Sequence, residues 1–131
     1  MKSTKKMMAL CLLAGGLWTV TGVLAADIDV DAAKALAKKN NCFKCHAIDK
    51  TKKGPAYRDI AFKFKGKPDA EEKIIEHFTV DNEVILEDCS TDDHKIIETK
   101  DKAAIKNLVA WILSLPDGVA RVSSKDRCKK G

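Results

Sequence analysis

The chain has 131 residues, with 24 lysines and arginines against 19 aspartates and glutamates, and only 5% of its residues are aromatic. Its first 25 residues have the composition of a removable leader, so about 106 remain, enough for one domain but not two. Three basic residues (Lys2, Lys5 and Lys6) lie in that leader, which leaves 21 basic against 19 acidic side chains. Such a balance, without a basic run interleaved with aromatics, excludes a dedicated nucleic-acid-binding protein.

Residues 1–25 have the pattern of a secretory signal peptide. A basic start is followed by an apolar run over residues 7–24, and Val23-Leu24-Ala25 has the character of a cleavage site. The alternative is an uncleaved membrane anchor. The glycines and threonines within the apolar run make it less stable as a membrane span, which argues against this alternative. No second long apolar stretch follows, so we expect no membrane span after signal removal and a periplasmic location.

The first helical patterns of the mature chain cover residues 29–40 and 56–65. Asp29 or Asp31 can cap the first pattern, in which small or apolar residues recur on one helix face: Ala33, Leu36 and Ala37. The second pattern is weaker and follows a polar loop closed by Gly54-Pro55.

Two further helices are predicted over residues 69–78 and 99–115, the first of them capped by Asp69. The second has the strongest apolar stripe in the chain and ends at Pro116: Ala104, Ile105, Leu108, Trp111, Ile112 and Leu115. Residues 80–95 are acidic and irregular, and no segment has a convincing strand pattern. We therefore expect one all-α domain over residues 26–118, followed by a polar tail over residues 119–131.

The motif Cys42-Phe43-Lys44-Cys45-His46 carries the clearest chemistry in the chain. Two thiols three residues apart can each add to one vinyl group of a haem, and the adjacent histidine then presents its imidazole to the iron. A thioredoxin-like site would need a βαβ context, and a zinc site would need a second Cys or His cluster. A structural disulfide between the two cysteines would leave His46 unexplained, so the motif predicts one covalent haem c.

Three segments resemble the small bacterial class I cytochromes c: NCFKCHAID at 41–49, KGPAYRDIA at 53–61 and LVAWILSL at 108–115. The resemblance implies one all-α domain of about four or five helices around a single covalent haem. It implies that Cys42 and Cys45 form thioethers and that His46 is the proximal ligand. The carbonyl of Pro55 would then accept the proton on the outer nitrogen of His46, and Trp111 would pack where the last helix crosses the first.

The sixth iron ligand departs from that family, which usually supplies a methionine. All three methionines lie in the leader, whereas His94 lies 17 residues before Trp111, about where the family places the methionine. We therefore expect His94 to be the distal ligand. His77 is the competing ligand. It lies, however, where related cytochromes place a basic residue near a haem propionate, so a role as propionate partner is favoured for it. Cys89, a lysine or an open iron are weaker alternatives.

The remaining cysteines, Cys89 and Cys128, form either an intramolecular disulfide or two free or intermolecular thiols. An oxidising compartment favours the disulfide, which would tie the tail to the loop that carries His94.

The predicted function is periplasmic electron transfer between transient protein partners. Six lysines surround the haem motif and would orient such partners, unless they are only a solvated surface: Lys38, Lys39, Lys44, Lys50, Lys52 and Lys53. No nucleophile–base arrangement stands out, so we do not expect an enzyme. Two alternatives remain: a haem sensor whose distal histidine is displaced by a small ligand, and an electron-donating subunit of a redox enzyme.

Overall fold

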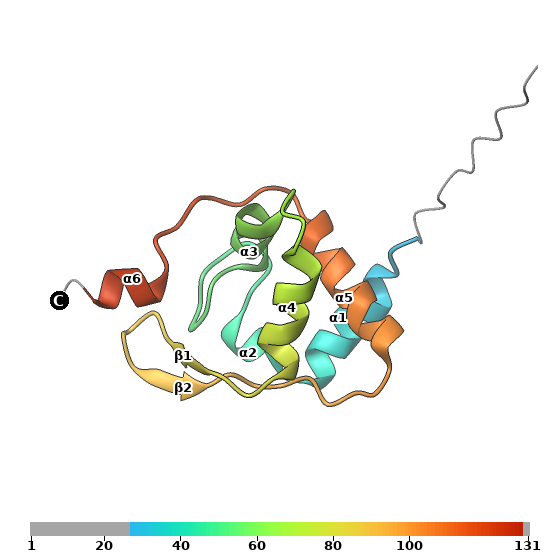
Figure 1. Cartoon of the computed structure of the whole chain (residues 1–131), viewed down its shortest axis with the longest axis horizontal. Coiled ribbons are helices and arrows are strands. Elements are labelled where there is room, and N and C mark those ends of the chain that lie inside the picture. The colour runs from blue at the N-terminus through green and yellow to red at the C-terminus, as the bar shows by residue number, and fades with distance from the viewer. Residues whose placement is uncertain (1–26, 130–131) are drawn as a thin grey trace, which may run out of the picture.

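The computed structural model describes residues 27–129, so the predicted signal peptide lies outside the described residues. Helices make up most of the fold, and a small hairpin lies at one edge (Figure 1). The elements in chain order are α1 (Val30–Lys39), α2 (Cys42–Cys45), α3 (Tyr57–Phe64), α4 (Ala70–Thr79), β1 (Glu83–Ile85), β2 (Thr91–Asp93), α5 (Lys102–Ser114) and α6 (Ser124–Cys128). Among the described residues, no helix has the length and apolarity needed to cross a membrane.

Capping side chains determine where the long helices begin. Asp29 accepts a hydrogen bond from the Ala32 N–H and caps α1, as predicted. Asp101 accepts from the first turn of α5, so that helix begins at Lys102 rather than at residue 99. Asp69 occupies the N-cap position of α4, as predicted, but its side chain makes no cap hydrogen bond. Its carboxylate pairs with Lys73 at 2.7 Å instead.

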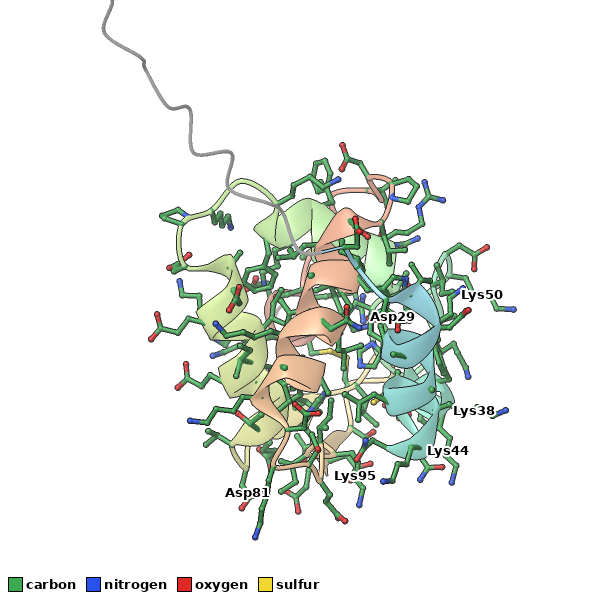
Figure 2. The ribbon with its side chains drawn as sticks, turned by 90° about the vertical axis from the view of Figure 1, so that its right-hand side faces the viewer. Asp29, Lys38, Lys44, Lys50, Asp81 and Lys95 are labelled. Atoms are coloured by element: carbon green, nitrogen blue, oxygen red, sulfur yellow. A yellow bond between two sulfur atoms is a disulfide. The ribbon has the colours of Figure 1, made fainter. Side chains whose placement is uncertain are left out.

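Helix α5 is the centre of the core, because it packs against α1, α3 and α4. The two views agree that α1 and α5 lie side by side (Figures 1 and 2). Ala33 and Ala37 are fully buried in the same apolar cluster as Trp111, which confirms the small face predicted for α1. Val109 is also buried, outside the predicted stripe of α5.

Residues 80–95 contain a two-stranded antiparallel hairpin, so the prediction of no strand is wrong. Glu83 pairs with Asp93 and Ile85 pairs with Thr91. Each strand has only three residues, and β2 is fully exposed, so no alternating apolar pattern marks it in the sequence. The turn between the strands contains Cys89, which has a positive φ of 67°.

The tail also has more structure than its polar composition indicates. It runs from the end of α5 past α3 to the hairpin, where it forms α6 (Figure 1). Cys128 at the end of α6 forms a disulfide with Cys89 in the hairpin turn. This confirms the intramolecular pairing and removes Cys89 from the alternatives for an iron ligand.

Candidate functional site

A cavity of about 1390 Å³ opens between α2, α3, α4, the hairpin and the tail. All six predicted site residues line it: Cys42, Cys45, His46, Pro55, His77 and His94. Its apolar wall comes from the core side of the fold and includes Ile74, Phe78, Ile97, Leu108 and Ile112. A large apolar space with a few polar groups directed into it is typical of a cofactor site.

The two thiols of the haem motif lie on the single turn of helix α2. Asn41 precedes this turn in the left-handed conformation (φ 59°), which redirects the chain after α1. Cys42 and Cys45 are both free and half-buried, so they form no structural disulfide. Burial raises the pKa of Cys42, so its thiol stays protonated. Both sulfurs are therefore available for addition to vinyl groups of a haem in the cavity.

His46 is held on one edge by a backbone carbonyl and on one face by an aromatic ring. Its Nδ1 lies 2.7 Å from the Pro55 carbonyl oxygen and donates to it, which leaves Nε2 with a free lone pair. The Tyr57 ring stacks on the imidazole, with centroids 5.2 Å apart and planes 20° from parallel. Burial lowers the pKa of His46, so the ring is neutral at pH 7. The ring is thus prepared to bind a metal through Nε2.

Gly54 leaves the space that this imidazole needs. A Cβ at position 54 would lie 2.8 Å from Cε1 of His46, a contact that forces one of them to move. We expect Gly54→Ala to lower the free energy of unfolding of the holoprotein by about 1–3 kcal/mol, as overpacking does. The electron paramagnetic resonance spectrum of the ferric haem should change as the imidazole turns.

Gly66→Ala is the matched control for Gly54→Ala. Gly66 has a φ of +79°, and an added Cβ would meet no atom within 4 Å. The control should therefore lose stability through backbone strain alone, with an unchanged haem spectrum. An unchanged spectrum in Gly54→Ala would contradict the close approach to His46.

His94 faces His46 across the cavity. It follows strand β2, where its N–H donates to the Asn82 carbonyl at 2.8 Å. The centroids of the two imidazoles are 6.2 Å apart. Two imidazoles that share one metal from opposite sides have centroids about 6 Å apart, since each metal–nitrogen bond is about 2 Å. The spacing therefore fits a haem iron between the two rings.

The environment of His94 also fits a metal ligand. Its Nδ1 is buried and has no hydrogen-bond partner. Burial, together with the charges of His77 and His46, lowers the pKa of His94 to about 4. A buried imidazole nitrogen without a hydrogen-bond partner is costly, and a metal bond would satisfy it.

His77 lies beside His94. It projects from α4, and its ring centroid is 4.2 Å from that of His94. The structure thus brings all three histidines of the chain to one cavity.

Sequence reasoning missed three features of this cavity. The weak helical pattern of residues 56–65 gives no sign that Tyr57 stacks on His46, and nothing in the sequence marks Gly54 as a contact of His46. The tail residues 119–127 also line the cavity. Only the pairing of Cys89 with Cys128 signalled that the tail lies close to the hairpin.

Comparisons with known proteins support this interpretation of the site. The family model for cytochrome c matches residues 30–116. The class 1 cytochrome MtoD from Sideroxydans lithotrophicus superposes with a TM-score of 0.64 at 53% identity, covering 67% of this chain and 97% of that one. Cytochrome c552 from Nitrosomonas europaea superposes with a TM-score of 0.51 at 32% identity, covering 63% of this chain and 98% of that one.

The match to curated sequences is shorter. Cytochrome c-551 from Pseudomonas aeruginosa is 43% identical over 65 residues, which cover 50% of this chain and 58% of that protein. The chain thus spans little more than half of that relative's length. The family match, the structural neighbours and the helical architecture confirm the expected class I fold. The chain belongs to the cytochrome c family and carries one covalent haem c with iron.

Proposed function

We propose that this protein is a periplasmic electron carrier whose single haem iron is held between His46 and His94. The observation that carries the proposal is the pair of imidazoles of His46 and His94 in the cavity, whose ring centroids lie 6.2 Å apart. The unpartnered Nδ1 of His94 supports it, because that nitrogen has no protein group to satisfy it. Two firmly held nitrogen ligands keep the coordination of the iron the same in both oxidation states, which favours electron transfer over ligand chemistry.

Each site residue has a distinct task in this proposal. Cys42 and Cys45 would hold the haem covalently, each thiol adding across one vinyl group so that sulfur bonds to one carbon and the hydrogen goes to the other. Pro55 holds the tautomer of His46 through the 2.7 Å hydrogen bond. His77, at the exposed side of α4, would donate to a haem propionate. The bound haem supplies the one-electron couple between Fe(III) and Fe(II).

The proposed location and partners follow from other features of the chain. The leader pattern of residues 1–25 and the Cys89–Cys128 disulfide both suit an oxidising compartment outside the cytoplasm. Lys38, Lys44 and Lys50 point outward from the side of the molecule formed by α1 and the haem-motif segment, away from Asp81 (Figure 2). This polarity supports orientation of transient redox partners by charge.

Absorption spectra of the purified holoprotein test the proposal directly. We expect low-spin spectra for the oxidised and the reduced protein, with no change when carbon monoxide is added to the reduced form. A high-spin spectrum, or rapid carbon monoxide binding, would contradict the closed coordination and favour a ligand sensor.

The reduction potential tests the identity of the distal ligand. A methionine thioether raises the potential of a haem relative to imidazole. We expect His94→Met to raise the potential by on the order of 0.1 V, within the ~0.8 V range that axial ligands set. His77→Met is the matched control and should shift the potential much less. A redox titration that shows the larger shift for His77→Met would assign the distal bond to His77.

A further inference from the structure

Residues 119–128, which we name the strap, form one wall of the haem cavity. They lie beyond the part of the chain that the family model matches, which ends at residue 116. The strap residues 119–127 line the cavity together with the haem motif and the three histidines. Val119 and Val122 are largely exposed, so the strap is a thin layer between the cavity and solvent.

The start of the strap is attached to helix α3 through one carboxylate. Asp59 accepts hydrogen bonds from the Val119 N–H at 2.9 Å and from Nε of Arg121 at 2.7 Å. Its side chain is only 10% exposed, so these bonds are shielded from water. Gly118 reinforces the attachment, because its N–H donates to the Arg58 carbonyl at 3.1 Å.

The end of the strap is attached to the hairpin through Glu87. The Glu87 carboxylate accepts from the Ser124 hydroxyl and from Nη2 of Arg127, each at 2.9 Å. Its carbonyl accepts from the same Arg127 nitrogen at 3.0 Å. Its N–H donates to the Lys53 carbonyl at 3.1 Å, in the loop that leads to Pro55. Glu87 therefore joins the strap, the hairpin that leads to His94 and the loop behind His46.

The Cys89–Cys128 disulfide closes the strap covalently two residues further along the hairpin. The Arg127–Glu87 pair is partly exposed, and exposed ion pairs contribute little by themselves. The disulfide spans 39 residues of sequence, and a cross-link of that length removes much of the freedom of the open chain. The covalent bond is therefore the dominant restraint on this end of the strap.

We propose that the strap is a latched wall: the disulfide holds it over the cavity, and cleavage of the disulfide opens the haem to small molecules. The inference rests on the proposed function only in taking His94 as the distal ligand. A dithiol reductant opens the latch by thiol–disulfide exchange. The Cys89–Cys128 disulfide takes up two electrons and two protons and becomes two thiols, and the reductant becomes a cyclic disulfide. Opening frees the hairpin turn, and His94, which follows β2, then leaves the iron more readily.

Cyanide binding to the ferric holoprotein measures this opening. The native protein is compared with protein cleaved by dithiothreitol, alkylated with iodoacetamide and reoxidised with ferricyanide, and with the double variant Cys89→Ser/Cys128→Ser. We expect the binding rate to rise about tenfold or more in both disulfide-free forms, because the strap and hairpin lose their cross-link. Native protein treated with iodoacetamide and ferricyanide but no reductant should keep the original rate.

Paired carboxylate variants separate the latch from general surface effects. Glu87→Ala, with the disulfide intact, should raise the rate by a smaller factor of up to about fivefold. Glu71→Ala is the control, because Glu71 also forms an ion pair, with Lys106 at 3.3 Å, but does not line the haem cavity. This variant should leave the cyanide-binding rate unchanged.

Each result has a defined meaning. Unchanged cyanide rates in both disulfide-free forms, with native circular dichroism, would overturn the latch. If the double variant does not fold, the cleaved and alkylated native protein and Glu87→Ala decide the matter. A high-spin native protein would overturn the proposed distal ligation instead, and the ratio of rates between latched and open forms would still test the strap.

Discussion

Replacing His94 with alanine is expected to open the iron to carbon monoxide. The variant removes the imidazole whose ring centroid lies 6.2 Å from that of His46, a spacing suited to a shared metal. The thioethers and His46 remain, so the haem stays attached with one coordination position exposed to the cavity. Reduced His94→Ala should bind carbon monoxide completely within a manual mixing time, whereas the reduced native protein should not bind it. The Soret band of the reduced protein, with and without carbon monoxide, measures the difference.

His77→Ala is the control for this experiment. Its ring contacts that of His94, with centroids 4.2 Å apart, so both variants remove an imidazole from the same part of the cavity. His77→Ala should keep a low-spin spectrum and should not bind carbon monoxide. A low-spin spectrum that persists in His94→Ala would identify His77 as the ligand. A low-spin spectrum that also persists in the variant His77→Ala/His94→Ala would exclude both histidines.

The second large effect is expected from loss of the haem. Cys42→Ala/Cys45→Ala cannot attach a haem covalently, and we expect the haem-free chain to show no cooperative thermal transition. The physical reason is the cavity of about 1390 Å³, whose apolar wall consists of core side chains such as Leu108 and Ile112. Protein interiors are close-packed, and unfilled apolar volume is strongly destabilising. The bound haem would fill the cavity and complete a core that is poor in aromatic residues.

Circular dichroism at increasing temperature measures this dependence on haem. The His94→Ala holoprotein is the matched control, because it keeps the covalent haem while losing a site residue. It should melt cooperatively, at a somewhat lower temperature than the native protein. A haem-free chain that melts cooperatively near the native midpoint would show that the helices form their core without the haem.

Local sequence patterns determined much of the fold and the proximal half of the site. The helices follow from apolar periodicity and from caps such as Asp29, which act within one turn of the chain. Cys42, Cys45 and His46 are neighbours in sequence, so their chemistry could be predicted before any contact was known. The bounds of α5 differ from the prediction because the Asp101 carboxylate caps the helix three residues later than expected.

The distal half of the site depends on contacts between distant segments. His94 was a candidate because the chain after the leader has no methionine and because His94 lies about where the resembled family places that ligand, 17 residues before Trp111. Its position opposite His46 depends on the hairpin, whose strands of three residues leave no alternating pattern in the sequence. A strand that short is stabilised by its pairing partner and by the disulfide in its turn, and neither contribution is encoded locally.

The strap shows the same division between sequence and tertiary structure. Cysteine number and compartment were enough to predict the bond between Cys89 and Cys128. The path of the strap along the cavity was not predictable, because Asp59 and Glu87 bind strap residues that lie 60 and 40 positions away in sequence. The sequence by itself therefore determined the haem attachment, the helices and the disulfide pairing, which depend on residue type and local spacing. Only the tertiary structure decided which histidine ring lies 6.2 Å from that of His46 and what covers the cavity, because those positions result from long-range packing.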